Sequence, residues 1–178
     1  SRMKWSRWSH VQVVKSEAVE SLVRALLLSL ANFQGVPLVC VFDNPKTIVL
    51  KHEGSVIEWN STFAQVAIDM RFAAELCTPA RGNEKGAVEN LVKWVKNSFF
   101  KVRRFHDRAD LDRQLAEWLK EINERRPSRA TGEIPAKRLA EEKKRLRPLP
   151  IAPSDYALRI PIMVGPTGHV VYQNVRYS

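Results

Sequence analysis

A short apolar run that ends at a carboxylate constrains the fold of this chain more than any other feature. Residues 36–42 read Val-Pro-Leu-Val-Cys-Val-Phe, Asp43 follows, and Asn44 and Pro45 break the pattern. A continuous apolar run of this length is typical of a strand covered on both faces of a sheet. The sequence therefore predicts a layered α/β domain with Asp43 at the carboxyl end of a buried strand.

Helix and strand patterns alternate along the first two thirds of the chain. Ser16 is placed to cap an amphipathic helix that Gly35 ends, and Asn60 or Ser61 can cap another helix. The predicted elements are a strand over 3–14, a helix over 16–35, the strand over 36–42, a small hairpin around Gly54, a helix over 60–70, a strand over 72–77, and helices over 86–100 and 108–123. This order resembles a ribonuclease H-like core, in which helices flank a mixed sheet, without its first strand.

The composition changes twice toward the carboxyl end, which predicts three parts. Residues 1–124 carry the α/β pattern, and residues 125–150 are basic and rich in proline, as in a linker, with one short helix near 136–146. Residues 151–178 show β-like alternation with a turn at 165–168. We expect this last part to be a hairpin that starts a small β-barrel.

The charge of the chain indicates a polyanionic partner. The 178 residues carry a net charge of +10, which favours nucleic acid as that partner. Residues 101–150 hold 15 lysines and arginines against 9 acids, whereas residues 51–100 hold 6 of each. The basic surplus therefore lies downstream of the central part of the chain, where an extended substrate can run.

The two cysteines and the apolar stretches point to a cytoplasmic protein without a membrane anchor. Cys40 and Cys77 have no metal-binding spacing and fall in predicted strands, so we interpret them as core thiols of a reducing compartment. The longest apolar stretch, residues 25–33, contains Ser29 and Asn32 and is too short to cross a bilayer.

A second carboxylate, Glu89, lies where a polar loop becomes a helix. One strand-end acid and one helix acid can share Mg²⁺, the kind of metal clamp that phosphodiester chemistry uses. Lys93 and Lys96 follow at helical spacing on the same face, which suits a phosphate backbone beside the metal. The structural alternative is that Asp43 caps a turn and that Glu89 and Lys93 form an ordinary surface pair.

These residues resemble a known family. Asp43 after a strand, followed by Glu89 in the segment 79–90, resembles two of the carboxylates of DDE transposases and retroviral integrases. More narrowly, the chain resembles IstA-type insertion-sequence transposases in the stretches 33–37, 42–47, 139–142, 146–150 and 172–178. The resemblance implies a polynucleotidyl transferase with two Mg²⁺ or Mn²⁺ ions that cleaves 3′ ends and transfers DNA strands, with Asp43 and Glu89 as metal-binding catalytic acids.

The resemblance also implies how DNA and partner proteins bind. The expected DNA-binding residues are Asn44, Lys46, Arg81, Asn83, Lys85, Lys93, Lys96, Lys101, Arg103 and Arg104. The loop 79–86 matches a mobile active-site loop. The implied partners are transposon ends and target DNA, further copies of the chain and an AAA+ ATPase helper, with no membrane, in the bacterial cytoplasm at the nucleoid.

The sequence departs from the family pattern at one position. The family's first Asp lies on the first strand, but residues 1–42 contain no Asp. We therefore expect an amino-terminally truncated catalytic core that is inactive alone, although its parent is an enzyme. Two alternatives remain open: a non-catalytic nucleic-acid-binding module with an integrase-like fold, and a ribonuclease H-type nuclease that acts on hybrids.

Overall fold

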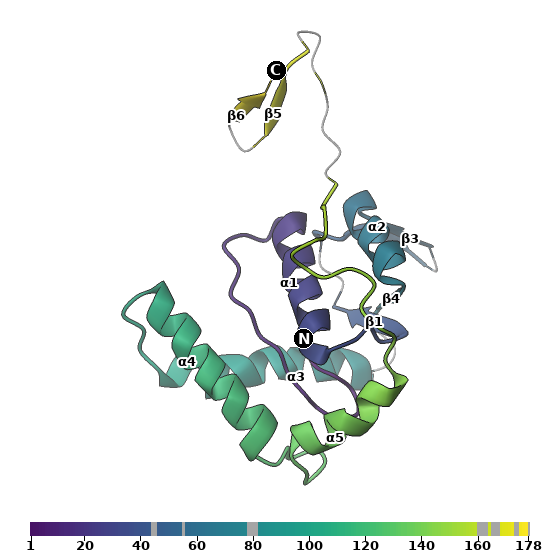
Figure 1. Ribbon diagram of the computed structural model, residues 1–178. Helices are drawn as coiled ribbons and strands as arrows, with labels where there is room; N and C mark the ends of the chain where they lie inside the picture. Colours follow the sequence, from purple (N-terminus) through teal and green to yellow (C-terminus); the bar gives the residue numbers. More distant parts are fainter. Residues whose placement is uncertain are drawn as a thin grey trace.

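The computed structural model describes residues 1–43, 46–54, 56–77, 82–159, 164, 168–172 and 175–177. Helices and strands alternate in its first half, and helices predominate from residue 82 to residue 145 (Figure 1). The elements are α1 (Val19–Phe33), β1 (Val39–Phe42), β2 (Val49–Glu53), β3 (Val56–Trp59), α2 (Ser61–Met70), β4 (Ala73–Leu76), α3 (Gly82–Ser98), η1 (Phe100–Val102), α4 (Arg108–Lys120), the π-helical η2 (Glu121–Arg125), α5 (Pro135–Glu142), η3 (Lys143–Arg145), β5 (Val170–Tyr172) and β6 (Val175–Tyr177).

The described strands form three small sheets. β1 pairs with β4 in parallel, from Val39 opposite Ala73 to Phe42 opposite Leu76. β2 and β3 form an antiparallel hairpin, as predicted, and Gly54 has a φ of +57° in its turn, a conformation that favours glycine. The mixed α/β composition is therefore confirmed, with pairs of strands rather than one continuous sheet in the described part of the chain.

β1 is less covered than its apolar sequence predicts. Its burial alternates, with Cys40 and Phe42 facing the interior and Val39 and Val41 exposed at 41% and 46%. One face of β1 therefore packs on the core while the other face is accessible. The expectation of a strand covered on both faces is wrong for this structure.

The first core cluster lies between α1, α2 and the two parallel strands. Val23, Phe63 and Val66 are fully buried in it. The ring of Phe63 has its centroid 5.1 Å from that of Phe42 and 5.3 Å from that of Trp59. Asn60 caps α2, as predicted, because its side-chain oxygen accepts hydrogen bonds from the first backbone N–H groups of the helix.

The second core cluster joins α3 to α4 through aromatic rings. Phe99 is fully buried, with its ring 5.2 Å from Trp118 and 5.5 Å from Phe105. Trp94 lies against Trp118 at 5.1 Å, so it belongs to this cluster. Val92, also in α3, is 48% exposed.

The first residues form a turn that is hydrogen-bonded to later parts of the chain, and the predicted strand over 3–14 is not present. Backbone N–H groups of Trp5 and Ser6 donate to the Glu142 carboxylate at 3.3 and 3.0 Å. The buried Ser9 exchanges two hydrogen bonds of 2.9 and 2.8 Å with the Asn123 side chain. Figure 1 shows this segment running to α5 and then back past α4 toward the start of α1.

The start and the end of α1 differ from the prediction. The helix begins at Val19 after Ala18, and the Ser16 hydroxyl bonds to Ser21 instead of capping the helix. Gln34, with a φ of 59°, is the left-handed residue at its end. Gly35 comes next, at a close contact with residues 146 and 147 rather than as the helix stop.

Residues 125–150 pack on the rest of the chain. α5 contacts η2, and the backbones of Val36 and Arg147 exchange hydrogen bonds of 2.8 and 3.0 Å. The short helix predicted near 136–146 is present as α5 and η3. No described helix is long and apolar enough to cross a membrane.

Two short strands are described near the end of the chain. β5 pairs with β6, so Val170 lies opposite Tyr177. Most of the predicted first strand, residues 160–163, and most of the predicted turn, residues 165–167, lie outside the described residues. Figure 1 shows this hairpin apart from the other labelled elements.

Candidate functional site

Asp43 lies at the carboxyl end of β1, next to the end of β4. Asp43 is exposed, and the backbone N–H of Cys77 donates to the Phe42 carbonyl at 2.9 Å. Because β1 and β4 run in parallel, both strands end at the same edge, where α/β sheets tend to bind ligands. The chain that leaves β4 for α3 therefore starts beside Asp43.

Glu89 lies within α3, seven residues after its first residue, Gly82. The side chains of Glu89, Asn83 and Lys85 lie outside the described part of the structure, as do Asn44 and Arg81. Within the described residues, no group of three His, Cys, Asp or Glu side chains is placed to hold a metal ion. A shared metal between Asp43 and Glu89 therefore stays a prediction.

The remaining expected DNA-binding residues differ in how they are held. Lys46, Lys93, Lys96, Lys101 and Arg104 are exposed. Arg103 is half-buried, and its guanidinium donates to the Ser98 carbonyl at 3.1 Å and lies 4.9 Å from the centre of the Phe99 ring. Arg103 therefore supports the end of α3, while the lysines are accessible to a polyanion.

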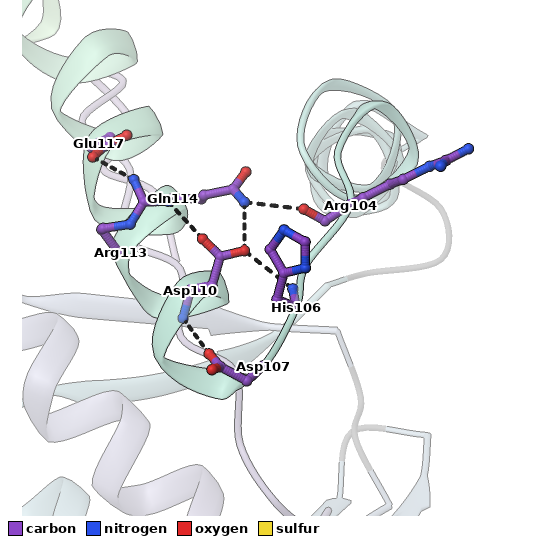
Figure 2. Close-up of polar contacts among 7 residues, drawn as sticks. All are labelled: Arg104, His106, Asp107, Asp110, Arg113, Gln114 and Glu117. Carbon is purple, nitrogen blue, oxygen red and sulfur yellow. Dashed lines mark hydrogen bonds and ion pairs between the residues drawn. The ribbon is translucent and has the colours of Figure 1, made fainter.

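A network of acids around Asp110 fixes the basic segment before α4 (Figure 2). The Asp110 carboxylate accepts from the backbone N–H of His106 at 3.2 Å and from the Arg113 guanidinium at 2.6 Å. The His106 N–H first, and then Arg113, hold the pKa of Asp110 below its usual value. Gln114 links Asp110 to the Arg104 carbonyl, so these acids order residues 104–107 instead of forming a metal site.

The pKa of Cys40 is raised by its burial to about 12. Cys40 lies in β1 with its side chain half-buried toward the core. A thiol with such a pKa is protonated at neutral pH, so it is a poor nucleophile and metal ligand. The core-thiol interpretation of Cys40 therefore fits its surroundings.

A basic groove beside Lys93 was not predicted from the sequence. A cavity of about 700 Å³ is lined by Lys93 and Trp94 of α3, by Arg2 and Arg7, and by Arg126 and Arg129. These cations are up to 127 positions apart in the chain. The groove depends on tertiary contacts between distant segments. The overall positive charge is therefore the only signal in the sequence for this cluster of cations.

The chain is similar in sequence to insertion-sequence transposases. It is 33% identical over 151 residues to the transposase proposed for element IS5376 of Geobacillus stearothermophilus, covering 85% of this chain and 37% of that protein. It is 33% identical over 147 residues to the IS21 transposase of Pseudomonas aeruginosa, covering 82% and 38%. The IS640 transposase of Shigella sonnei is 31% identical over 135 residues, covering 75% and 43%. The chain thus spans less than half the length of these relatives, and no family model matches it.

Two solved structures are similar to this chain in fold. The catalytic core domain of BIV integrase superimposes with a TM-score of 0.53 and 13% identity, covering 76% of this chain and 79% of that one. A chain of the simian T-cell lymphotropic virus intasome gives a TM-score of 0.58 and 17% identity, covering 96% and 65%. These likenesses confirm the ribonuclease H-like, integrase-like fold. The chain is therefore a homologue of a segment of the insertion-sequence transposases and has the fold of a retroviral integrase core.

Proposed function

We propose that this chain is the catalytic-core segment of a DNA transposase, which cleaves the 3′ ends of a transposon and transfers them to target DNA. The observation that carries the proposal is the position of Asp43 at the shared edge of β1 and β4, from which the chain continues into α3 and Glu89. The one-third identity to transposases over most of the chain supports it.

The chemistry of Asp43 fits a divalent metal. Its carboxylate is exposed and makes no hydrogen bond or ion pair with the described part of the chain. Mg²⁺ and Mn²⁺ prefer such oxygen ligands, and Mg²⁺ sites often use only one or two protein carboxylates. Asp43 and Glu89 would hold the metal pair of a two-metal site, which would stabilise the attacking and leaving oxygens of the phosphodiester.

The accessible cations of α3 and η1 account for substrate binding in this proposal. Lys93, Lys96 and Lys101 are exposed after Glu89 in the chain. Lysines in such positions bind phosphate oxygens and place a DNA strand in register, without reading its sequence. Arg103 and Arg104 extend this surface toward α4.

The finer parts of the proposal concern the longer protein. We include in it a third carboxylate from outside these 178 residues, so that the segment alone is inactive. The proposal also divides the chain into a catalytic core that ends at residue 124, a linker that ends at residue 150, and residues 151–178 as part of a DNA-binding β-barrel. It further includes assembly with further copies on paired DNA ends, an AAA+ ATPase helper, and action in the bacterial cytoplasm.

The test is metal-dependent chemistry by the full-length protein that contains this chain. Labelled transposon-end duplex and an RNA–DNA hybrid are each incubated with Mg²⁺, Mn²⁺ or EDTA, and the products are separated on a denaturing gel. The proposal predicts 3′-end cleavage and strand transfer of the duplex with either metal and none in EDTA. Cleavage of the hybrid alone would favour the nuclease alternative, and salt-sensitive DNA binding without cleavage would favour the non-catalytic module.

A further inference from the structure

The groove beside α3 gathers positive charge from three separate parts of the chain. We call it the arginine groove and define it by Arg2, Arg7, Lys93, Trp94, Arg126 and Arg129. None of the described residues that line it is an Asp or a Glu. A cavity lined by five cations attracts anions, since no acid among its described lining residues neutralises them.

Arg2 is fixed on one wall of the arginine groove. Its Nε donates to the Ser9 hydroxyl at 2.8 Å, and its guanidinium carbon lies 4.5 Å from the centre of the Trp94 ring. Burial, and then the positive charge of Arg7, lower the pKa of Arg2 to about 10, so it stays charged at neutral pH. Its fork of donors is thus held in place before any anion arrives.

Arg7 lines the same groove, and one of its donors has no partner among the described residues. Its Nε is buried and has no hydrogen-bond partner in the described part of the chain. Its backbone φ is 66°, in the left-handed region that a side chain such as arginine adopts at an energetic cost. Two arginines that line one groove repel each other, and an anion bound beside them offsets that repulsion.

The position of the groove along α3 indicates which anion it takes. Asn90, Lys93, Trp94 and Asn97 line it, so its described lining on α3 includes the residue next to Glu89. Seven residues of helix span about 10 Å, or roughly three nucleotides at about 3.4 Å per nucleotide of one strand. A strand that passes Glu89 can therefore place successive phosphates against these cations.

We propose that the arginine groove binds the phosphodiester backbone of a DNA strand whose scissile end lies at the carboxylate site. The inference rests on the proposed function and adds Arg2, Arg7, Arg126 and Arg129 to the substrate-binding surface. The arginines bind phosphate oxygens through paired N–H donors, and the asparagine amides can donate to the same backbone. Sequence specificity is not expected from these contacts.

The test compares two pairs of substitutions that remove the same charge from the full-length protein. Arg126→Ala with Arg129→Ala removes two exposed groove cations, and Lys15→Ala with Lys120→Ala removes two exposed cations that do not line it. DNA affinity is measured by fluorescence anisotropy in EDTA between 50 and 300 mM salt. Near-ultraviolet circular dichroism confirms that both variants are folded.

The groove pair is expected to weaken DNA binding by at least about tenfold at 0.1 M salt and to make the log–log salt slope shallower by roughly 2. The control pair should change the affinity by less than about threefold, because its cations lie away from the strand. Equal effects of the two pairs, or no effect of either, would overturn the inference. If the inference is overturned in this way but metal-dependent cleavage is normal, the proposed function still stands. If the unsubstituted protein neither binds nor cleaves DNA, the inference and the proposed function are both contradicted.

Discussion

Gly35 occupies a space that admits no side chain. A Cβ at this position would lie 2.7 Å from the Leu146 Cβ and 2.9 Å from the Arg147 carbonyl oxygen. The backbones of Val36 and Arg147 are hydrogen-bonded at the same point. The glycine therefore lets the segment after α5 approach the end of α1, and the fit depends on contacts more than a hundred residues apart.

Substituting this glycine should loosen that contact. Gly35→Ala is expected to lower the free energy of unfolding by about 1–3 kcal/mol, because backbone and Leu146 must shift to admit the methyl group. Urea unfolding followed by circular dichroism measures the change. An unfolding free energy that equals the unsubstituted value would contradict the close approach.

The hydrogen bond between Tyr156 and Asp69 ties residues 151–159 to α2. The Tyr156 hydroxyl donates to the Asp69 carboxylate at 2.7 Å. This bond first, and then the bond from Gln65, lower the pKa of Asp69 below its usual value. A carboxyl group whose pKa falls on folding contributes stability above its unfolded pKa, and that stability is lost as the pH falls through the folded pKa.

Tyr156→Phe should therefore destabilise the protein in a pH-dependent way. The expected cost is about 1 kcal/mol at pH 7, since the carboxylate loses one partner but keeps access to water. The difference from the unsubstituted protein should shrink as Asp69 becomes protonated in acid. Urea titrations at pH 7 and near pH 3 measure it, and a difference that is constant between them would argue against this bond.

Among the elements, patterns set by neighbouring residues could be predicted from the sequence. The Asn60 cap, the hairpin around Gly54 and the strand after α2 depend on local spacing and are present. The prediction of a strand over 3–14 was wrong, because these residues form a turn that is hydrogen-bonded to Asn123 and Glu142. The predicted pairing across the turn at 165–168 stays a prediction, because most of those residues lie outside the described part of the chain.

The link between η2 and the amino-terminal segment can be tested at Asn123. Asn123→Leu keeps the branched shape and the number of heavy atoms but leaves the N–H and carbonyl of the buried Ser9 without the Asn123 partners. We expect a loss of about 2–3 kcal/mol in unfolding free energy and faster hydrogen exchange at the Ser9 amide. Unchanged exchange at this amide would show that the pairing does not hold the segment.

For the whole molecule, the layered α/β fold and the family resemblance could be predicted, whereas the docked segments and the groove could not. The position of Asp43 at a strand end could be predicted from the turn signal after it, and that of Glu89 on a helix from the helical pattern after a polar loop. The arginine groove joins residues 2 and 7 to residues 126 and 129 only through packing on α3 and α5. Such juxtapositions depend on the tertiary structure rather than on local sequence.

The central claim is that Asp43 and Glu89 form the metal-binding acid pair of a DNA transposase. The most direct test is metal-dependent 3′-end cleavage by the full-length protein carrying Asp43→Asn or Glu89→Gln. Asp112→Asn and Glu117→Gln, two exposed acids of α4 that make surface ion pairs, are the matched controls. The account predicts that each site variant loses on the order of 10³-fold or more in cleavage rate, because metal clamping is worth several kcal/mol, while each control retains its rate. Cleavage that survives either site substitution would contradict the account.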